Sequence, residues 1–316
     1  MILNSYNYTN NPIYNVSLYE LTESYDDLIY NISSMQISHI TEEVSYDMIN
    51  EASKASLTII KVIGKALGLL VKLIAKAIDF YKKAKSYIVS IFKKAQDDIK
   101  KNKIRNVDTS DFKEFEYEMK EYNSDYASAF KMINVWYTKL AAFLISIYVD
   151  AIKAVKNPAN NDITQRLSMS ISQSSKNIFD MDDVNNSEVN KLIDEKFYKS
   201  PEKKTVKITK DYVNKITSEI SKDESNSNKL MSLQDNIGKV ANISKTKLQN
   251  LQSNIPKDES TLLDNKVSHT INNLINKTQS YCNILIYGTA RATNLFIEKV
   301  NVETNILTKI YNSKKK

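Results

Sequence analysis

Apolar residues recur with a helical period along most of the chain, and the clearest case lies between residues 51 and 105. From 57 to 81 almost every position is apolar except for lysines that recur at steps of four and seven. On a helix these lysines fall within about 60° of one another, so they form one narrow row. The row consists of Lys54, Lys61, Lys65, Lys72, Lys76 and Lys83. The pattern predicts a long helix over 51–105 with a broad apolar face.

Three interpretations of this helix are open. It can be the central helix of a bundle with one wet row of lysines, or an amphipathic helix whose lysines reach lipid phosphates. A single transmembrane span is disfavoured, because Lys65 and Lys72 would each cost about 2.5–3.5 kcal/mol near the bilayer centre. Gly64 and Gly68 form a small-residue pair that would permit close approach of another helix.

A second apolar helix is expected to start near Asp111 and to run to about Val155, with or without a break at 123–124. Asn157 and Pro158 should end it, because the residue before a proline is pushed out of the α region. The uninterrupted apolar window before Asp150 is too short for a membrane span. We therefore expect this helix to pack against the first one.

The C-terminal third again has apolar residues at steps of three and four, interrupted by Pro256. This spacing predicts an antiparallel hairpin of two long helices. From Val267 to Ile306 a heptad-like seam continues without a proline, which suggests that this region could also self-associate. The seam has four imperfections, at Thr278, Gly288, Ala292 and Lys299.

The predicted fold class is all-α: an elongated bundle of long helices with a coiled-coil-like C-terminal helical hairpin. Only 4 Gly and 4 Pro occur in 316 residues. Since barrels, sandwiches and nucleotide-binding folds need many tight turns, this composition nearly excludes them. We expect four segments: an acidic arm or propeptide (1–50), an apolar helical domain (51–157), a loose, partly helical polar linker (158–205) and a long-helix region (206–316).

Little catalytic chemistry is available. The chain has one cysteine and two histidines, which excludes an internal disulfide and a cysteine-based metal site. His269 and Cys282 lie about 220° apart on one predicted helix, so they cannot act together. His39 has no second metal ligand nearby, and the sequence from Asp180 to Asp183 lacks the glycine and the closing glutamate of a calcium loop. We expect no enzyme, cofactor, metal or small-molecule substrate.

Charge is distributed unevenly. Residues 1–50 have seven acidic groups and no Lys or Arg, whereas residues 51–107 have 14 basic and four acidic groups. The N-terminal segment is therefore either an acidic leader that screens the basic helix or a surface arm whose charge is accidental. The chain has 41 Lys and 3 Arg and is rich in Asn, Ile and Tyr, which indicates an AT-rich genome. The net charge of +7 is thus weak evidence for nucleic-acid binding.

One resemblance to a known family appears over about residues 42–95. The sequences of residues 51–66 and 73–83 resemble minor virion proteins of large tailed bacteriophages with low-GC hosts. Leu21-Thr22-Glu23 and Ile40-Thr41-Glu42 resemble the (Leu/Ile)-x-Glu sites of phage prohead proteases. The resemblance implies processing after Glu23 or Glu42, with residues 1–42 as a capsid-targeting propeptide. It also implies a location in the virion after assembly in the host cytoplasm, in keeping with the lack of a secretory signal at the N-terminus.

The sequence therefore predicts a non-enzymatic phage virion structural protein, inside the head or ejected, whose lysine row contacts membrane or DNA. Expected partners are other virion proteins or further copies of the chain, together with lipid and non-specific DNA. Two alternatives stay open: an α-helical pore-forming protein, and a purely structural coiled-coil assembly protein. The lysines within the apolar run and the lack of a secretion signal count against the pore-forming class.

Overall fold

The computed structural model describes residues 16–34, 55–101, 113–123, 125–256 and 265–313. Within these residues the chain forms eight helices and two strands. In chain order they are α1 (Leu18–Ser34), α3 (Ala55–Lys101), β1 (Phe115–Tyr122), α4 (Ala127–Lys156), α5 (Asn161–Ser172), α6 (Ser174–Phe179), α7 (Asn186–Phe197), β2 (Tyr198–Ile208), α8 (Lys210–Asn254) and α9 (Asn265–Ser313). The predicted all-α fold class is confirmed.

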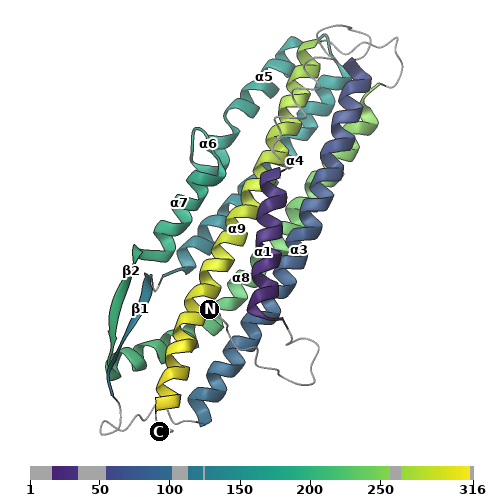
Figure 1. Ribbon diagram of the computed structural model, residues 1–316. Coiled ribbons are helices and arrows are strands. Elements are labelled where there is room, and N and C mark those ends of the chain that lie inside the picture. The colour runs from purple at the N-terminus through teal and green to yellow at the C-terminus, as the bar shows by residue number, and fades with distance from the viewer. Residues whose placement is uncertain (1–15, 35–54, 102–112, 124, 257–264, 314–316) are drawn as a thin grey trace.

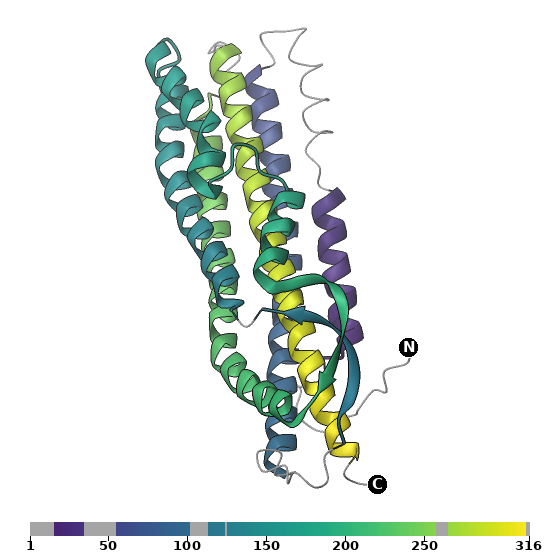
Figure 2. The same cartoon turned by 90° about the vertical axis from the view of Figure 1, so that its left-hand side faces the viewer.

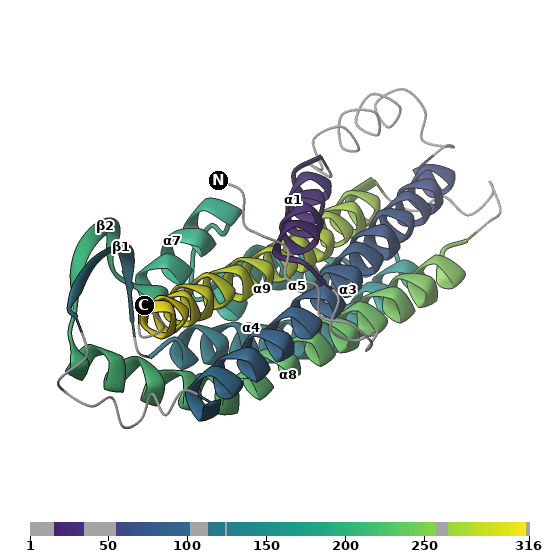
Figure 3. The same ribbon diagram turned by 60° about the horizontal axis from the view of Figure 1, so that its bottom comes forward.

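Four long helices, α3, α4, α8 and α9, lie side by side along an elongated bundle (Figure 1). α3 and α4 each contact both α8 and α9. α8 runs away from the end that holds the strands and α9 returns toward it, which is the predicted antiparallel hairpin (Figure 2). α1 lies outside α3 and α9 (Figure 3), while α5, α6 and α7 follow one another along α4 and α9 (Figure 1).

α3 is a core helix of the bundle. Its apolar positions face inward, and Ile63, Leu73 and Phe80 have no exposed surface. The lysines fall on the remaining side, as expected for long charged side chains that cannot be buried unpaired. Among the three interpretations of the 51–105 segment, the arrangement of α3 in this structure is that of a bundle-core helix.

The strands correct one prediction. We expected a helix from about Asp111, but β1 begins at Phe115 and alternates apolar and charged residues, with Tyr117 half-buried and Glu116 exposed. Its antiparallel partner β2 lies beyond four intervening helices, with Phe115 opposite Ile208. Because strand pairing depends on this distant partner, the local period could not reveal it. Val206 and Ile208, at the start of the predicted long-helix region 206–316, also belong to β2.

Opposite charges face each other across the two strands. β1 and the residue before it supply glutamates, and β2 supplies lysines; the pairs are Glu114–Lys207, Glu118–Lys203 (3.3 Å), Glu121–Lys204 (2.8 Å) and Glu121–Lys199 (3.6 Å). The side chains are largely exposed, so each pair contributes little to the free energy of unfolding. Their main effect is to favour this register over its neighbours.

The segment 158–205 is more ordered than the loose connector we expected. Asn160 caps α5 by accepting a hydrogen bond from the Ile163 amide. Asn185 and Glu188 form a capping box at the start of α7. Asn160 and Asn185, two polar residues of the expected linker, are thus helix-capping residues. α4 does end at Lys156, directly before Asn157 and Pro158, as predicted.

The imperfections of the α9 seam, the 267–306 heptad-like row, have structural reasons. The hydroxyl of Thr278 lies 3.1 Å from that of Tyr148 on α4. Gly288 lies under α7, where a Cβ would come within 3.0 Å of Val189 Cγ1. Nearly the whole seam is buried inside the chain. Self-association stays a prediction, and it would have to use other surfaces.

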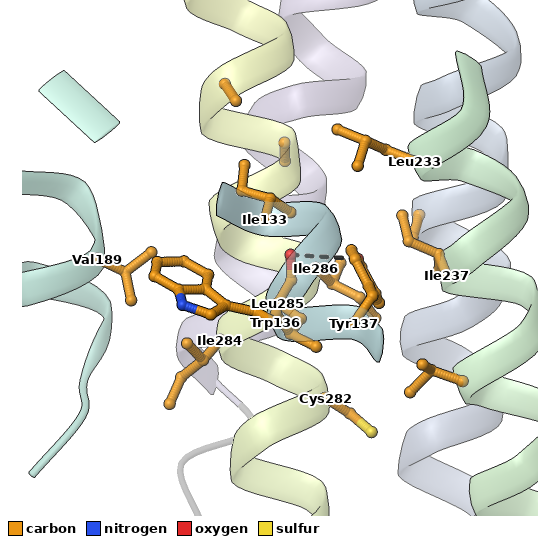
Figure 4. Close-up of a cluster of buried hydrophobic side chains, with 14 of the residues drawn as sticks. Ile133, Trp136, Tyr137, Val189, Leu233, Ile237, Cys282, Ile284, Leu285 and Ile286 are labelled. Atoms are coloured by element: carbon orange, nitrogen blue, oxygen red, sulfur yellow. Dashed lines mark hydrogen bonds between the residues drawn. The ribbon is translucent and has the colours of Figure 1, made fainter. Parts of the chain in front are cut away.

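Figure 4 shows the centre of the core, where Trp136 and Tyr137 of α4 meet α7, α8 and α9. The Trp136 and Phe179 rings lie edge to face, 5.4 Å apart. The Tyr137 hydroxyl lies 2.9 Å from that of Thr289, so its polar end is satisfied although it is buried. Cys282 is a buried core residue.

The glycines make a paired prediction. Nothing among the described atoms lies within 4 Å of a Cβ built on Gly64 or Gly68, so these glycines serve no close approach inside the chain. Gly64→Ala should raise the free energy of unfolding by up to about 1 kcal/mol through helix propensity. In Gly288→Ala the new methyl group would crowd Val189, which should cancel the gain in helix propensity. The larger side chain of Gly288→Leu should lower the free energy of unfolding by about 1–3 kcal/mol. Urea unfolding measures all three, and equal stabilisation at positions 64 and 288 would contradict the packing.

Candidate functional site

The predicted lysine row lies on the outer side of α3. Lys61, Lys65, Lys72 and Lys76 are exposed, and Lys83 is half-buried. Lys54 lies outside the described residues. From Lys61 to Lys76 the row extends over 15 helical steps, or roughly 22 Å at 1.5 Å per residue. It is a basic face rather than a pocket, so its chemistry is attraction of phosphate or carboxylate groups.

α1 covers one end of this row. Asp27 Oδ2 lies 2.5 Å from Lys76 Nζ, and Lys83 is paired with Asp79 of α3 at 3.0 Å. The Ser24 hydroxyl donates to the same Asp79 carboxylate. In this structure the acidic N-terminal segment therefore neutralises part of the basic helix.

α1 is attached to the bundle by a narrow apolar face. Leu21, Leu28 and Ile32 are buried, and the Tyr25 ring lies 5.7 Å from that of Phe80. The helix begins with a capping box in which the Ser17 amide donates to Glu20 at 2.7 Å, and this hydrogen bond lowers the pKa of Glu20. Of the two predicted processing sites, Glu23 is exposed on α1 and Glu42 lies outside the described residues.

A second feature, which sequence analysis missed, is a buried charge cluster between α8 and α9. Lys299 of α9 is 2% exposed. Its Nζ lies 2.5 Å from Asp223 Oδ2 on α8 and 3.0 Å from Glu303 Oε1 one helical turn later. Glu219 is farther away, at 4.0 Å, and is partly exposed. One ammonium group is thus surrounded by three carboxyl groups.

Aromatic rings enclose this cluster. Tyr126, directly before α4, donates a hydrogen bond to Asp223 Oδ1, and its ring centroid lies 5.0 Å from Lys299 Nζ. The ring of Phe296 stacks at a tilt on Tyr126, 5.1 Å away, and Phe130 adds an edge contact. The cluster therefore joins α8, α9 and the start of α4 in surroundings that exclude water.

Burial controls the ionisation of the cluster. It raises the pKa of Glu303 to about 8 against the opposing effect of Lys299, which favours the neutral carboxyl group. Burial also raises the pKa of Asp223, which Lys299 and the Tyr126 hydroxyl only partly offset. For Lys299, burial acts to lower the pKa, but the two carboxyl groups outweigh it and raise the pKa. The Oε2 atom of Glu303 is buried and has no hydrogen-bond partner among the described residues.

Two other α9 side chains hold the strands and α7. Glu298 accepts hydrogen bonds from the hydroxyls of Tyr122 on β1 and Tyr198 on β2, at 3.5 and 3.3 Å. Arg291 donates to both oxygens of Asp194 on α7. These contacts explain why α9 keeps polar residues on faces that would otherwise be apolar.

Part of the cluster was visible in the sequence. Lys299 stood out as an imperfection of the seam, and Glu303 follows it at the i+4 spacing of a helical ion pair. Asp223 lies 76 residues earlier, in a polar part of α8 that carries no distinguishing pattern. Only the packing of the two helices brings it to Lys299.

Within the described ranges no group of three or more His, Cys, Asp and Glu side chains is arranged to hold a metal ion. One described helix, α4, is long and apolar enough to cross a membrane by length and composition alone. In this structure α4 is also a core helix, with Ile133, Leu140 and Leu144 buried. No family model matches the chain, and neither a curated protein nor a solved structure matches it.

The ionisation of Glu303 gives a pH prediction. An unfolded glutamate has a pKa of about 4.3, so between that value and about 8 the folded chain binds a proton that the unfolded chain releases. The contribution of Glu303 to the free energy of unfolding should therefore fall as the pH rises from about 5 to about 8. Asp223, Glu219, Tyr122, Tyr126 and Tyr212 face the same cluster around Lys299.

The comparison is the change with pH of the wild type's stability relative to that of Glu303→Gln, because groups that titrate alike in both chains then cancel. Chemical unfolding across this pH range should show the wild type losing stability relative to the variant. A difference that does not change with pH would mean that Glu303 is ionised in the folded chain.

Proposed function

We propose that this chain is a non-enzymatic structural protein of a phage virion, inside the head or ejected with the genome. In this proposal the basic face of α3 contacts the phosphates of packaged DNA. The resemblance of the 42–95 region to minor virion proteins motivates the setting. The shape, a long bundle without a metal-ligand cluster among the described residues, suits a structural role.

The observation that supports the DNA contact best is the orientation of α3. Most of its apolar residues face the core, although Val71 is exposed, and Lys61, Lys65, Lys72 and Lys76 lie on the outside. Lysines bind the phosphate backbone without regard to sequence, by releasing counterions. The scarcity of arginine fits contact with the backbone rather than readout of bases.

The position of α1 suggests how this contact is controlled. Asp27 forms an ion pair with Lys76, which would otherwise be available to a DNA phosphate. A chain that begins at Glu43 would lack α1. The removed residues contain five acidic groups and no Lys or Arg, so the net charge would rise from +7 to +12. Processing after Glu42 would thus strengthen attraction to DNA. Mass spectrometry of virions that found an intact Met1 terminus would end the propeptide hypothesis.

A pore-forming protein is the second candidate, and α4 is the observation that favours it. This helix has the length and composition of a membrane span, and its outer side exposes Val135, Ile145 and Val149. Membrane insertion would require α4 to leave α8 and α9. The purely structural coiled-coil alternative needs neither lipid nor DNA.

DNA binding by the full chain and by the chain that begins at Glu43 tests the proposal. Fluorescence anisotropy with duplex DNA should show tighter binding by the shorter chain, weakening as salt rises. Reversing the charge of Lys61, Lys65, Lys72 and Lys76 should reduce the salt dependence by about 3–4 units of the log–log slope.

The matched control reverses four exposed lysines of α8 instead: Lys222, Lys229, Lys239 and Lys245. Equal loss of binding by both variants would show that net charge alone matters and would contradict a specific role for α3. Anionic and neutral vesicles form the second arm, and dye release from vesicles without DNA binding would favour the pore-forming candidate.

A further inference from the structure

The buried cluster brings an amine and a carboxyl group together under unusual conditions. Lys299 Nζ and Asp223 Oδ2 lie 2.5 Å apart, and both side chains are 2% exposed. A buried ion pair retains most of the desolvation cost of its two charges, and the Coulomb attraction often fails to recover it. A reaction that removes both charges would relieve this cost.

We propose that Lys299 and Asp223 condense to an isopeptide bond that joins α9 to α8. The amine nitrogen attacks the carboxyl carbon Cγ of Asp223, the bond from Cγ to Oδ2 breaks, and one water leaves. An ammonium group and a carboxylate are consumed, and a neutral amide and water are formed. Atoms and charges balance without an oxidant, a metal or any other reactant.

The neighbouring groups suit each step. The Tyr126 hydroxyl donates to Asp223 Oδ1, which polarises the C–O bond that becomes the amide carbonyl and stabilises negative charge on that oxygen during attack. Lys299 Nζ donates to Asp223 Oδ2, so its first proton can pass directly to that oxygen and leave a neutral amine and a neutral carboxyl group. Glu303 Oε1 lies 3.0 Å from the amine and accepts its second proton during the attack, while the protonated Glu303 passes its own proton to Oδ2, which leaves as water. The aromatic enclosure keeps out water that would reverse the reaction.

The exposed ion pair on α1 provides an internal comparison. Lys76 and Asp27 have the same 2.5 Å separation, but both side chains are 47% exposed. Water stabilises the two charges there and competes as a nucleophile. Proximity alone therefore does not lead to the bond, and the Lys76–Asp27 pair should stay ionic.

The mass of the full chain under denaturing conditions tests the bond. The wild type should be lighter than its sequence by one water, and Lys76→Arg should show the same loss relative to its own sequence. Lys299→Arg, which keeps the positive charge but cannot form the amide, should have its full sequence mass. Glu303→Gln should delay or abolish the loss while circular dichroism shows that the helices are retained.

A second measurement leaves every residue of the buried cluster unchanged. With a protease site introduced between residues 256 and 265, cleavage should leave α8 and α9 covalently joined in denaturant. A peptide map should then contain a branched peptide that links Lys299 to Asp223. A wild-type mass equal to the sequence mass, or separation of the two fragments in denaturant, would overturn the proposal.

Discussion

The burial of α9 on nearly every side is the constraint on which the rest of the structure depends. α1, α3, α4, α5, α7 and α8 all contact this one helix. A helix surrounded in this way exposes few polar side chains, such as His269, Asn273 and Lys309, so its other polar side chains need partners inside the bundle. Such partners come from other elements, among them Tyr137 of α4, Asp194 of α7, Tyr198 of β2 and Asp223 of α8.

Hydroxyl groups solve much of this problem locally. Thr278, Thr289 and Thr293 each donate to the carbonyl four residues earlier in α9. Tyrosines from neighbouring elements then use the same hydroxyls as partners, as Tyr137 and Tyr148 of α4 do. Lys299 cannot be satisfied this way, because a buried ammonium needs a negative charge as well as hydrogen bonds. Asp223 supplies it from α8, and this contact fixes how the two longest C-terminal helices meet.

The sequence predicted the parts of this architecture that follow from local period. The row of lysines between Lys61 and Lys83 identified the outer side of α3, and the three-four spacing identified α8 and α9. It failed where structure depends on distant partners: β1 pairs with β2 across four intervening helices, and Lys299 meets Asp223 only after two helices pack. It also failed where capping residues resembled a loop, although the Asn185–Glu188 spacing was a usable signal.

The stability of the Lys299→Met chain tests the central role of this buried charge most directly, with Lys76→Met as the exposed control. Removing Lys299 leaves Asp223 as a buried carboxyl group without the amine that neutralises it, either as an ion pair or as an amide, which should cost about 3–5 kcal/mol of unfolding free energy. Removing Lys76 breaks an exposed pair with the same separation and should cost about 0–1 kcal/mol. Equal and small losses in both variants, measured by urea unfolding at neutral pH, would contradict the account of α9 as a helix held by its buried polar contacts.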